Sequence, residues 1–170
     1  MNWAWLLFSF KGRIKRLTWW LTNLVVVVVI GLAGTIIEAV ADSQGLVAVD
    51  PETNEIEPTG IFGVILAILG LVNLWIIYAL GAKRLHDRDR TGWWLAVPLI
   101  ALIVGIVLAS MALSLPEGGR EPWNTLGVFT VFFIVGIWLW LLLEIGFLPG
   151  TEGPNRFGPD PKAGKSTREP

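Results

Sequence analysis

Four long apolar stretches, separated by short polar segments, dominate the pattern along the chain. They cover approximately residues 19–41, 61–82, 93–114 and 125–148. An α-helix rises about 1.5 Å per residue, so about 20 mostly apolar residues are enough to cross the hydrocarbon core of a bilayer. None of the stretches alternates apolar and polar positions in the manner of a membrane β-strand. The pattern therefore predicts four transmembrane helices.

The composition agrees with a membrane protein. The chain is 54% hydrophobic and only 16% charged, whereas a soluble domain has about 25% charged residues. It also contains ten tryptophans, and an indole ring is favoured at the lipid–water boundary. Five of them stand at the predicted ends of the spans: Trp19, Trp20, Trp93, Trp94 and Trp123. The absence of cysteine excludes disulfides, thiolate metal sites and thiol catalysis.

The distribution of charge predicts the orientation. Of 13 Lys and Arg residues, all but Arg120 lie before the first span, between the second and third spans, or after the fourth. The connection 42–60 is acidic instead. Because basic segments stay on the cytoplasmic side of the membrane, both termini are expected in the cytoplasm.

These features together predict an all-α integral membrane protein, a four-helix transmembrane bundle. A basic cytoplasmic or interfacial segment, 1–18, precedes the transmembrane domain, 19–148, and a Gly/Pro-rich cytoplasmic tail, 149–170, follows it. Residues 2–10 are apolar and precede the basic cluster, which is the reverse of the order in a secretory signal. We therefore expect the N-terminal segment to be retained in the mature protein.

Three polar segments are expected to meet on the cytoplasmic face. They are Phe10-Lys-Gly-Arg-Ile-Lys-Arg16, then Ala82-Lys-Arg-Leu-His-Asp-Arg-Asp-Arg-Thr-Gly-Trp-Trp94, and Pro149-Gly-Thr-Glu-Gly-Pro-Asn-Arg-Phe-Gly-Pro-Asp-Pro161. In these segments the chain resembles a family of bacterial inner-membrane proteins, domain of unknown function 805, with its F-x-G-R-x-x-R, R-L-H-D, G-W-W and G-x-x-G-x-N-x-(F/Y)-G-x-D-P patterns. The resemblance implies a small multi-pass protein of the bacterial cytoplasmic membrane, without an established activity.

The candidate interaction face consists of polar residues from the three segments: Arg13, Arg16, Arg84, His86, Asp87 and Asn155. Two interpretations stay open for its arginines. They can anchor the protein against anionic lipid headgroups and set its topology. Alternatively, they can form an anion site for a phosphate headgroup or an acidic peptide, because the guanidinium fork suits such groups.

His86, Asp87 and Asp89 could also suggest a metal or acid–base cluster, but one histidine without a second set of ligands argues against zinc. A structural role is favoured. We expect Asp87 to accept hydrogen bonds from an arginine of the first segment or from N–H groups at the start of the third span. His86 is expected to donate to a carbonyl of the tail. Asn155 is expected to cap a turn and to dock the tail onto the second segment.

Asn23, Asn73 and Glu144 are candidate polar residues inside the membrane. Asn23 and Glu144 lie about one turn inside the cytoplasmic boundary and could hydrogen-bond to each other. Glu144 could also handle protons, although pairing with Arg16 or Arg84 is the favoured interpretation, because long cationic side chains reach that depth. In the third span, the small residues Ala101, Gly105 and Ala109 repeat every four positions. They predict a close approach of a second helix.

The sequence therefore predicts a non-enzymatic membrane module, without catalytic, cofactor or metal residues, whose cytoplasmic face binds lipid headgroups or a protein partner. Anionic lipids are the expected ligands, with a homo-oligomer or a membrane protein partner as further possibilities. The net charge of −1 argues against nucleic acid. The alternative is a small oligomeric transporter or channel, although the polar pathway is thin. A lipid-modifying enzyme ranks last, because paired acidic motifs and a nucleophile with a base are missing.

Overall fold

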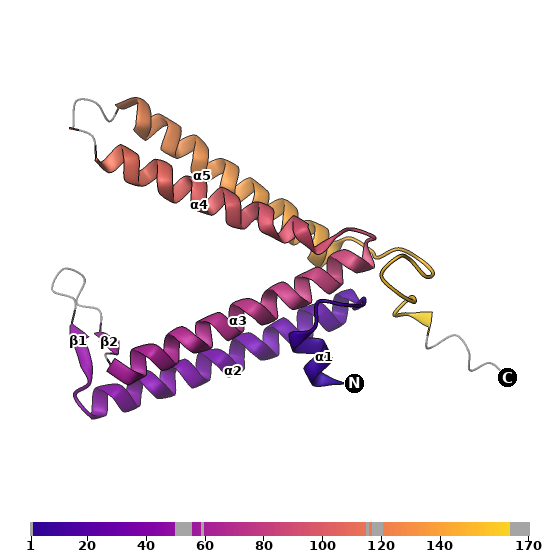
Figure 1. Cartoon of the computed structure of the whole chain (residues 1–170), viewed down its shortest axis with the longest axis horizontal. Helices are drawn as coiled ribbons and strands as arrows, with labels where there is room; N and C mark the ends of the chain where they lie inside the picture. Colours follow the sequence, from indigo (N-terminus) through magenta and orange to yellow (C-terminus); the bar gives the residue numbers. More distant parts are fainter. Residues whose placement is uncertain (1, 50–55, 59, 115, 117–120, 164–170) are drawn as a thin grey trace. The chain divides into compact units, whose positions relative to one another are not determined.

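A computed structural model describes residues 2–49, 56–58, 60–114, 116 and 121–163. It contains the helices α1 (Trp3–Phe8), α2 (Arg16–Ser43), α3 (Gly60–Asp87), α4 (Ala96–Leu113) and α5 (Glu121–Leu142) (Figure 1). A 3₁₀ turn, η1 (Gly92–Leu95), precedes α4, and a π-helical turn, η3 (Leu143–Phe147), follows α5. The strands β1 (Val47–Val49) and β2 (Ile56–Pro58) complete the set.

Four helical segments are long and apolar enough to cross a membrane, as predicted. They are Arg16–Ser43, Gly60–Asp87, Gly92–Leu113 and Thr125–Phe147. The second segment ends at Asp87, five residues beyond the predicted boundary at 82. This difference matters because the Arg84-Leu-His-Asp87 motif then lies on the last turn of α3 and not in a loop. The assembly of the four helices into one bundle, and the side on which the termini lie, stay predictions.

The chain divides into two compact units, Met1–Ser9 with Leu17–Leu80, and Phe10–Arg16 with Gly81–Pro170. In the first unit, α2 and α3 approach at Gly34, where an added Cβ would lie 4.0 Å from Leu66 Cδ2. The strands β1 and β2 form an antiparallel pair in which Ala48 faces Glu57. This pair occupies part of the connection that was predicted only as polar. The acidic residues of that connection at 50–55 lie outside the described residues, as do Arg120, Lys165 and Arg168.

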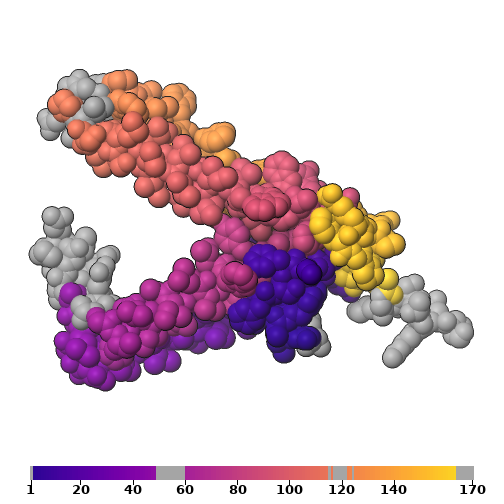
Figure 2. All heavy atoms as spheres, in the orientation of Figure 1, coloured from indigo at the N-terminus to yellow at the C-terminus, as the bar shows by residue number. Residues whose placement is uncertain are grey.

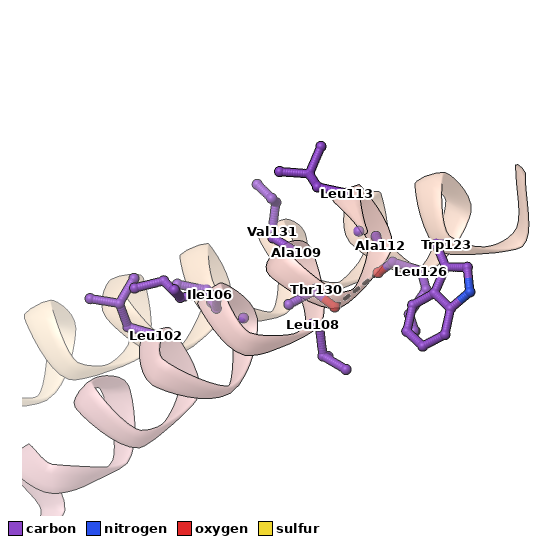
Figure 3. Close-up of a pocket in the computed structure, with 13 residues that line it drawn as sticks. Leu102, Ile106, Leu108, Ala109, Ala112, Leu113, Trp123, Leu126, Thr130 and Val131 are labelled. Carbon is purple, nitrogen blue, oxygen red and sulfur yellow. Dashed lines mark hydrogen bonds between the residues drawn. The ribbon is translucent and has the colours of Figure 1, made fainter. Parts of the chain in front are cut away.

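In the second unit, α4 and α5 pack against each other. A Cβ added at Gly105 would lie only 2.8 Å from Ile134 Cδ1, so the predicted close approach is confirmed at this position. On one side of the contact an apolar cavity of about 470 Å³ lies between the helices, and Ala109 and Leu126 contribute to its wall (Figure 3). Its one hydroxyl, on Thr130, donates to the Leu126 carbonyl at 2.9 Å within α5. The walls of this cavity are therefore mainly apolar.

Pro98 lies in the third predicted span, and a proline in the interior of a helix kinks it. The structure places it in the first turn of α4, immediately after η1. Proline is tolerated in a first turn, because the N–H it lacks would have no partner within the helix. The irregular, 3₁₀ part of this span is η1, which ends at Leu95, before the proline.

Candidate functional site

The candidate site lies entirely in the second unit, and we call it the polar cap. It consists of residues 10–16, the end of α3 with the following turn (81–90), and η3 with the tail (143–163). The tail, yellow in Figure 2, forms a compact body that contacts the other two parts of the cap through Arg13 and Asn155. All three predicted polar segments therefore contribute to one cluster.

Arg13 joins the three segments. Its Nε and Nη2 donate to Asp87 Oδ1 at 3.1 and 3.0 Å. Nη1 donates to the carbonyls of Gly153 and Gly158, and Nη2 donates to the Thr151 carbonyl at 2.7 Å. The side chain is only 1% exposed. A guanidinium has five N–H donors and no acceptor, so this set of partners uses the full donor capacity of Arg13.

Arg84 caps the end of the last span. Its guanidinium is fully buried and pairs with Asp87 Oδ2. It also donates to the Ile145 carbonyl at 2.8 Å and to the Leu148 carbonyl. The last carbonyls of a helix lack partners within the helix and carry partial negative charge. Arg84 donates to such carbonyls at the end of η3, which explains why a buried cation lies there.

Asp87 is shared by the two buried arginines, one on each carboxylate oxygen. The predicted bond to an arginine of the first segment is confirmed. Its backbone carbonyl accepts from Thr151 N at 2.7 Å and from Thr151 Oγ1 at 3.0 Å. A Cβ added at Gly150 would lie 2.5 Å from Asp87 Cγ, so only glycine allows the tail to approach this carboxylate.

His86 has a different partner from the one expected. Its Nδ1 lies 3.2 Å from the Gly12 carbonyl, so the carbonyl comes from the first segment and not from the tail. Gly12 has a φ of 95°, a conformation that glycine adopts without strain and that positions this carbonyl. The tail instead supplies the ring of Phe157, which stacks on the imidazole at 3.9 Å between centroids.

Asn155 docks the tail as predicted. Its Nδ2 donates to the His86 carbonyl at 2.8 Å, and its Oδ1 accepts from Phe157 N at 2.9 Å. The first bond joins the tail to the end of α3, and the second caps a turn. One amide side chain therefore performs both of the roles expected from the motif.

The predicted partners of Glu144 are wrong. Its Oε1 accepts from Arg88 Nε at 2.7 Å and forms an ion pair with Arg90 Nε at 2.8 Å. Arg84 is committed to Asp87, and Arg16 donates to the Phe147 carbonyl at 2.7 Å. Glu144 still pairs with arginines of the second polar segment. Its partners are the two arginines that follow the end of α3 at Asp87.

Asn23 and Asn73 lie outside the polar cap. Asn23 Nδ2 donates to the Trp19 carbonyl at 2.8 Å within α2, and the bond between Asn23 and Glu144 stays a prediction. Asn73 lies near the middle of α3, and its Oδ1 is buried without a hydrogen-bond partner among the described residues. Neither residue belongs to the site that the arginines build.

Sequence reasoning missed Gly150, Thr151 and the contacts of Arg156. Arg156 pairs with Asp89 at 3.1 Å and lies over the Phe157 ring, which places it at the outside of the stack on His86. The tail motif carried the signal for these positions, because its glycines and its aromatic residue are spaced at fixed intervals. The motif does not say which atoms they contact.

The polar cap is strongly cationic. Within its residue ranges there are ten Lys and Arg against five Asp and Glu. One of the acids, Asp160, accepts from the backbone N–H groups of Lys162 and Gly153 at 2.8 and 3.0 Å. The Lys162 bond is the larger cause that lowers the Asp160 pKa below its ordinary value. In the described part of the chain, no group of three or more His, Cys, Asp and Glu could hold a metal ion.

The four apolar helices and the cap at their ends define a multi-pass membrane protein. The model of the family described as "Protein of unknown function (DUF805)" matches residues 7–159, and the chain belongs to this family. It is 30% identical to the uncharacterized protein YiiR of Escherichia coli K12 over 156 residues, or 91% of this chain and 86% of YiiR. It is 25% identical to the inner membrane protein YhaH of the same strain over 157 residues, or 91% and 88% of the two chains. The protein is thus a homologue of an inner-membrane protein, and no solved structure matches it.

Proposed function

We propose that the protein is a non-enzymatic membrane module whose polar cap faces the cytoplasm and binds anionic lipid headgroups. The proposal rests on the difference between the buried and the exposed arginines of the polar cap. Arg13 and Arg84 are buried and bound to Asp87 and to backbone carbonyls. They hold the cap together, and their burial, at 1% and 0% exposed, keeps their guanidiniums from a ligand outside the cap. Ligand contacts therefore fall to the arginines at the edge.

The edge of the cap has more cation than anion. Arg88 and Arg90 share Glu144, and Arg16 is exposed and donates to the Phe147 carbonyl. Arg90 is 38% exposed, and its guanidinium lies 5.6 Å from the ring centre of Trp94. Guanidinium forks match phosphate oxygens, and tryptophan is favoured at headgroup depth. Together they suit a phosphate-bearing headgroup beside the ends of α4 and α5.

The cytoplasmic orientation rests on the same charges. Cations near an anionic leaflet contribute about 1 kcal/mol each, and the cytoplasmic leaflet of a bacterial membrane is expected to retain the basic segments. The excess of ten Lys and Arg over five Asp and Glu in the cap fits that leaflet. Reporter fusions at residue 88 and in the 42–60 connection test the orientation directly.

Lipid binding can be measured on the full chain in nanodiscs of phosphatidylcholine, with a fluorescent phosphatidylglycerol titrated in. The Arg16→Gln/Arg90→Gln variant leaves the Arg88–Glu144 pair intact. At about 1 kcal/mol for each arginine, we expect about 30-fold weaker retention of the anionic lipid. Arg156→Gln/Lys162→Gln removes the same charge from the tail and serves as the matched control, with little change expected.

Equal losses in the two variants would mean that net charge alone acts, which would refute a site at the edge. Equal retention of neutral and anionic lipid by the native protein would refute headgroup binding as such. If the native protein shows no lipid preference but captures another protein in membranes, and if this capture depends on Arg16 and Arg90, the surface binds a protein partner and not a headgroup.

A further inference from the structure

We infer that α1 is a re-entrant element, inserted among the acyl chains of one leaflet. This is the leaflet in which the Asp87 end of α3 lies. The sequence alone suggested a cytoplasmic or interfacial segment for residues 1–18. The structure divides this segment, because Met1–Ser9 groups with α2 and α3, whereas Phe10–Arg16 groups with the polar cap. The inference concerns acyl chains around α1 and is independent of the headgroup site.

The depth of α1 follows from its contact with α3. Trp75 Nε1 donates to the Phe8 carbonyl at 3.3 Å, so the end of α1 lies against α3. Trp75 lies eight residues before Lys83, the first charged residue of the cap on α3, which is about 12 Å along the helix axis. Half of the hydrocarbon core is about 15 Å thick. The contact therefore places the end of α1 well inside the apolar layer.

The backbone of α1 meets the requirement for such a place. In hydrocarbon every backbone polar group needs a partner within the protein. The Asn2 side chain accepts from Trp5 N at 3.2 Å, and the Asn2 carbonyl accepts from Leu6 N at 3.0 Å. At the other end, the bond from Trp75 satisfies a carbonyl that a helix end would leave without a partner. These bonds give partners to backbone groups at both ends of α1, as a medium without water requires.

The side chains of α1 agree with this environment. The helix reads Trp-Ala-Trp-Leu-Leu-Phe and has no charged residue. Leu6 is fully buried, whereas Trp3 and Phe8 point outward and are 60% and 50% exposed. Large exposed apolar side chains on both ends of a short helix are unfavourable in water and favourable among acyl chains. The depth set by Trp75 decides between these two media.

The basic residues that follow explain why the segment does not cross the membrane. Lys11, Arg13, Lys15 and Arg16 come directly after α1, and Arg13 is bound within the polar cap. Placing a charge at the centre of the bilayer costs at least about 2.5 kcal/mol. The chain therefore leaves the apolar layer at residue 10 and returns to it as α2.

Spin-label accessibility in phosphatidylcholine liposomes tests the inference, and a chain with no cysteine allows single sites to be labelled. We expect labels at Trp3→Cys and Phe8→Cys to be open to oxygen and shielded from a water-soluble nickel chelate. Leu71→Cys, on an exposed position of the α3 span, is the lipid control, and Glu152→Cys, in the exposed tail, is the water control. The chelate should reach the α1 labels about tenfold less than the tail label, because a polar reagent partitions poorly into hydrocarbon.

Chelate accessibility at both α1 sites equal to that of the tail label would overturn the inference. Should labelling disturb folding, hydrogen–deuterium exchange of residues 3–8 in the native protein gives the same decision, because amides in the apolar layer exchange slowly and those of a six-residue helix in water exchange fast. Trp75→Phe removes the donor to Phe8, and we expect it to raise chelate access at Phe8→Cys. Neutral liposomes keep this result separate from headgroup binding.

Discussion

Removal of the shared carboxylate in Asp87→Asn is the sharpest test of the polar cap. In the native protein Asp87 holds one buried arginine on each of its oxygens, and the two arginine side chains are 1% and 0% exposed. The amide keeps the shape of the side chain and one acceptor, but it has no charge. Its NH₂ group would also point a donor towards one of the guanidiniums.

The magnitude follows from burial. Breaking a buried ion pair by removing one partner costs about 3–5 kcal/mol, since it leaves a charge without compensation. Here two guanidiniums lose their carboxylate, but both keep carbonyl partners in the tail and at the end of η3. We therefore expect a loss of about 3–5 kcal/mol in the free energy of unfolding for the pair together and not for each arginine.

The assay is unfolding of the full chain in mixed micelles, followed by tryptophan fluorescence, together with limited proteolysis of the tail. The matched control is Asp89→Asn, two residues away, which removes an exposed pair with Arg156. Exposed ion pairs contribute about 0–1 kcal/mol, so the control should remain close to the native protein. If Asp87→Asn were no more destabilising than Asp89→Asn, the cap would not depend on the shared carboxylate, and the reasoning would fail.

Three further predictions concern the edge and the tail. Gly150→Ala should release the tail to protease, because the new Cβ would lie 2.5 Å from Asp87 Cγ; an intact tail would contradict the close approach. Glu144→Gln should lower the free energy of unfolding by about 1–3 kcal/mol through its two arginine partners, and a loss of proton flux in liposomes with unchanged stability would instead favour a transporter. Asp160 has a lowered pKa, so its contribution to tail order is present above the ordinary value of 3.8 and is lost as the pH falls through the lower, folded value. Amide exchange at Gly153 should accelerate over that range, and Asp160→Asn should abolish the pH dependence.

The transmembrane helices were predictable from the sequence because insertion depends on local properties. About 20 consecutive residues decide it through their own transfer free energies, whatever the rest of the chain does. The extension of α3 to Asp87 was missed because polar residues on a last helical turn resemble a loop in a hydropathy pattern. The β1–β2 pair was also missed, because strands of three residues give too little alternation to be recognised.

The polar cap was only partly predictable. The motifs indicated that Asp87 meets the first segment and that Asn155 docks the tail, and both contacts are present. Charge complementarity and turn chemistry were enough for these two. The sequence alone did not determine which arginines take Glu144 or which carbonyl takes His86.

Those choices were decided by the tertiary structure. Several arginines lie within reach of each carboxylate, and a hydrogen bond requires its donor within about 3 Å and in line with its acceptor. The path of the backbone sets these distances: Gly12 and Gly150 position the first segment and the tail, and the end of η3 presents the carbonyls that Arg84 caps. Sequence spacing determines which segments meet, whereas the folded backbone determines which atoms bind.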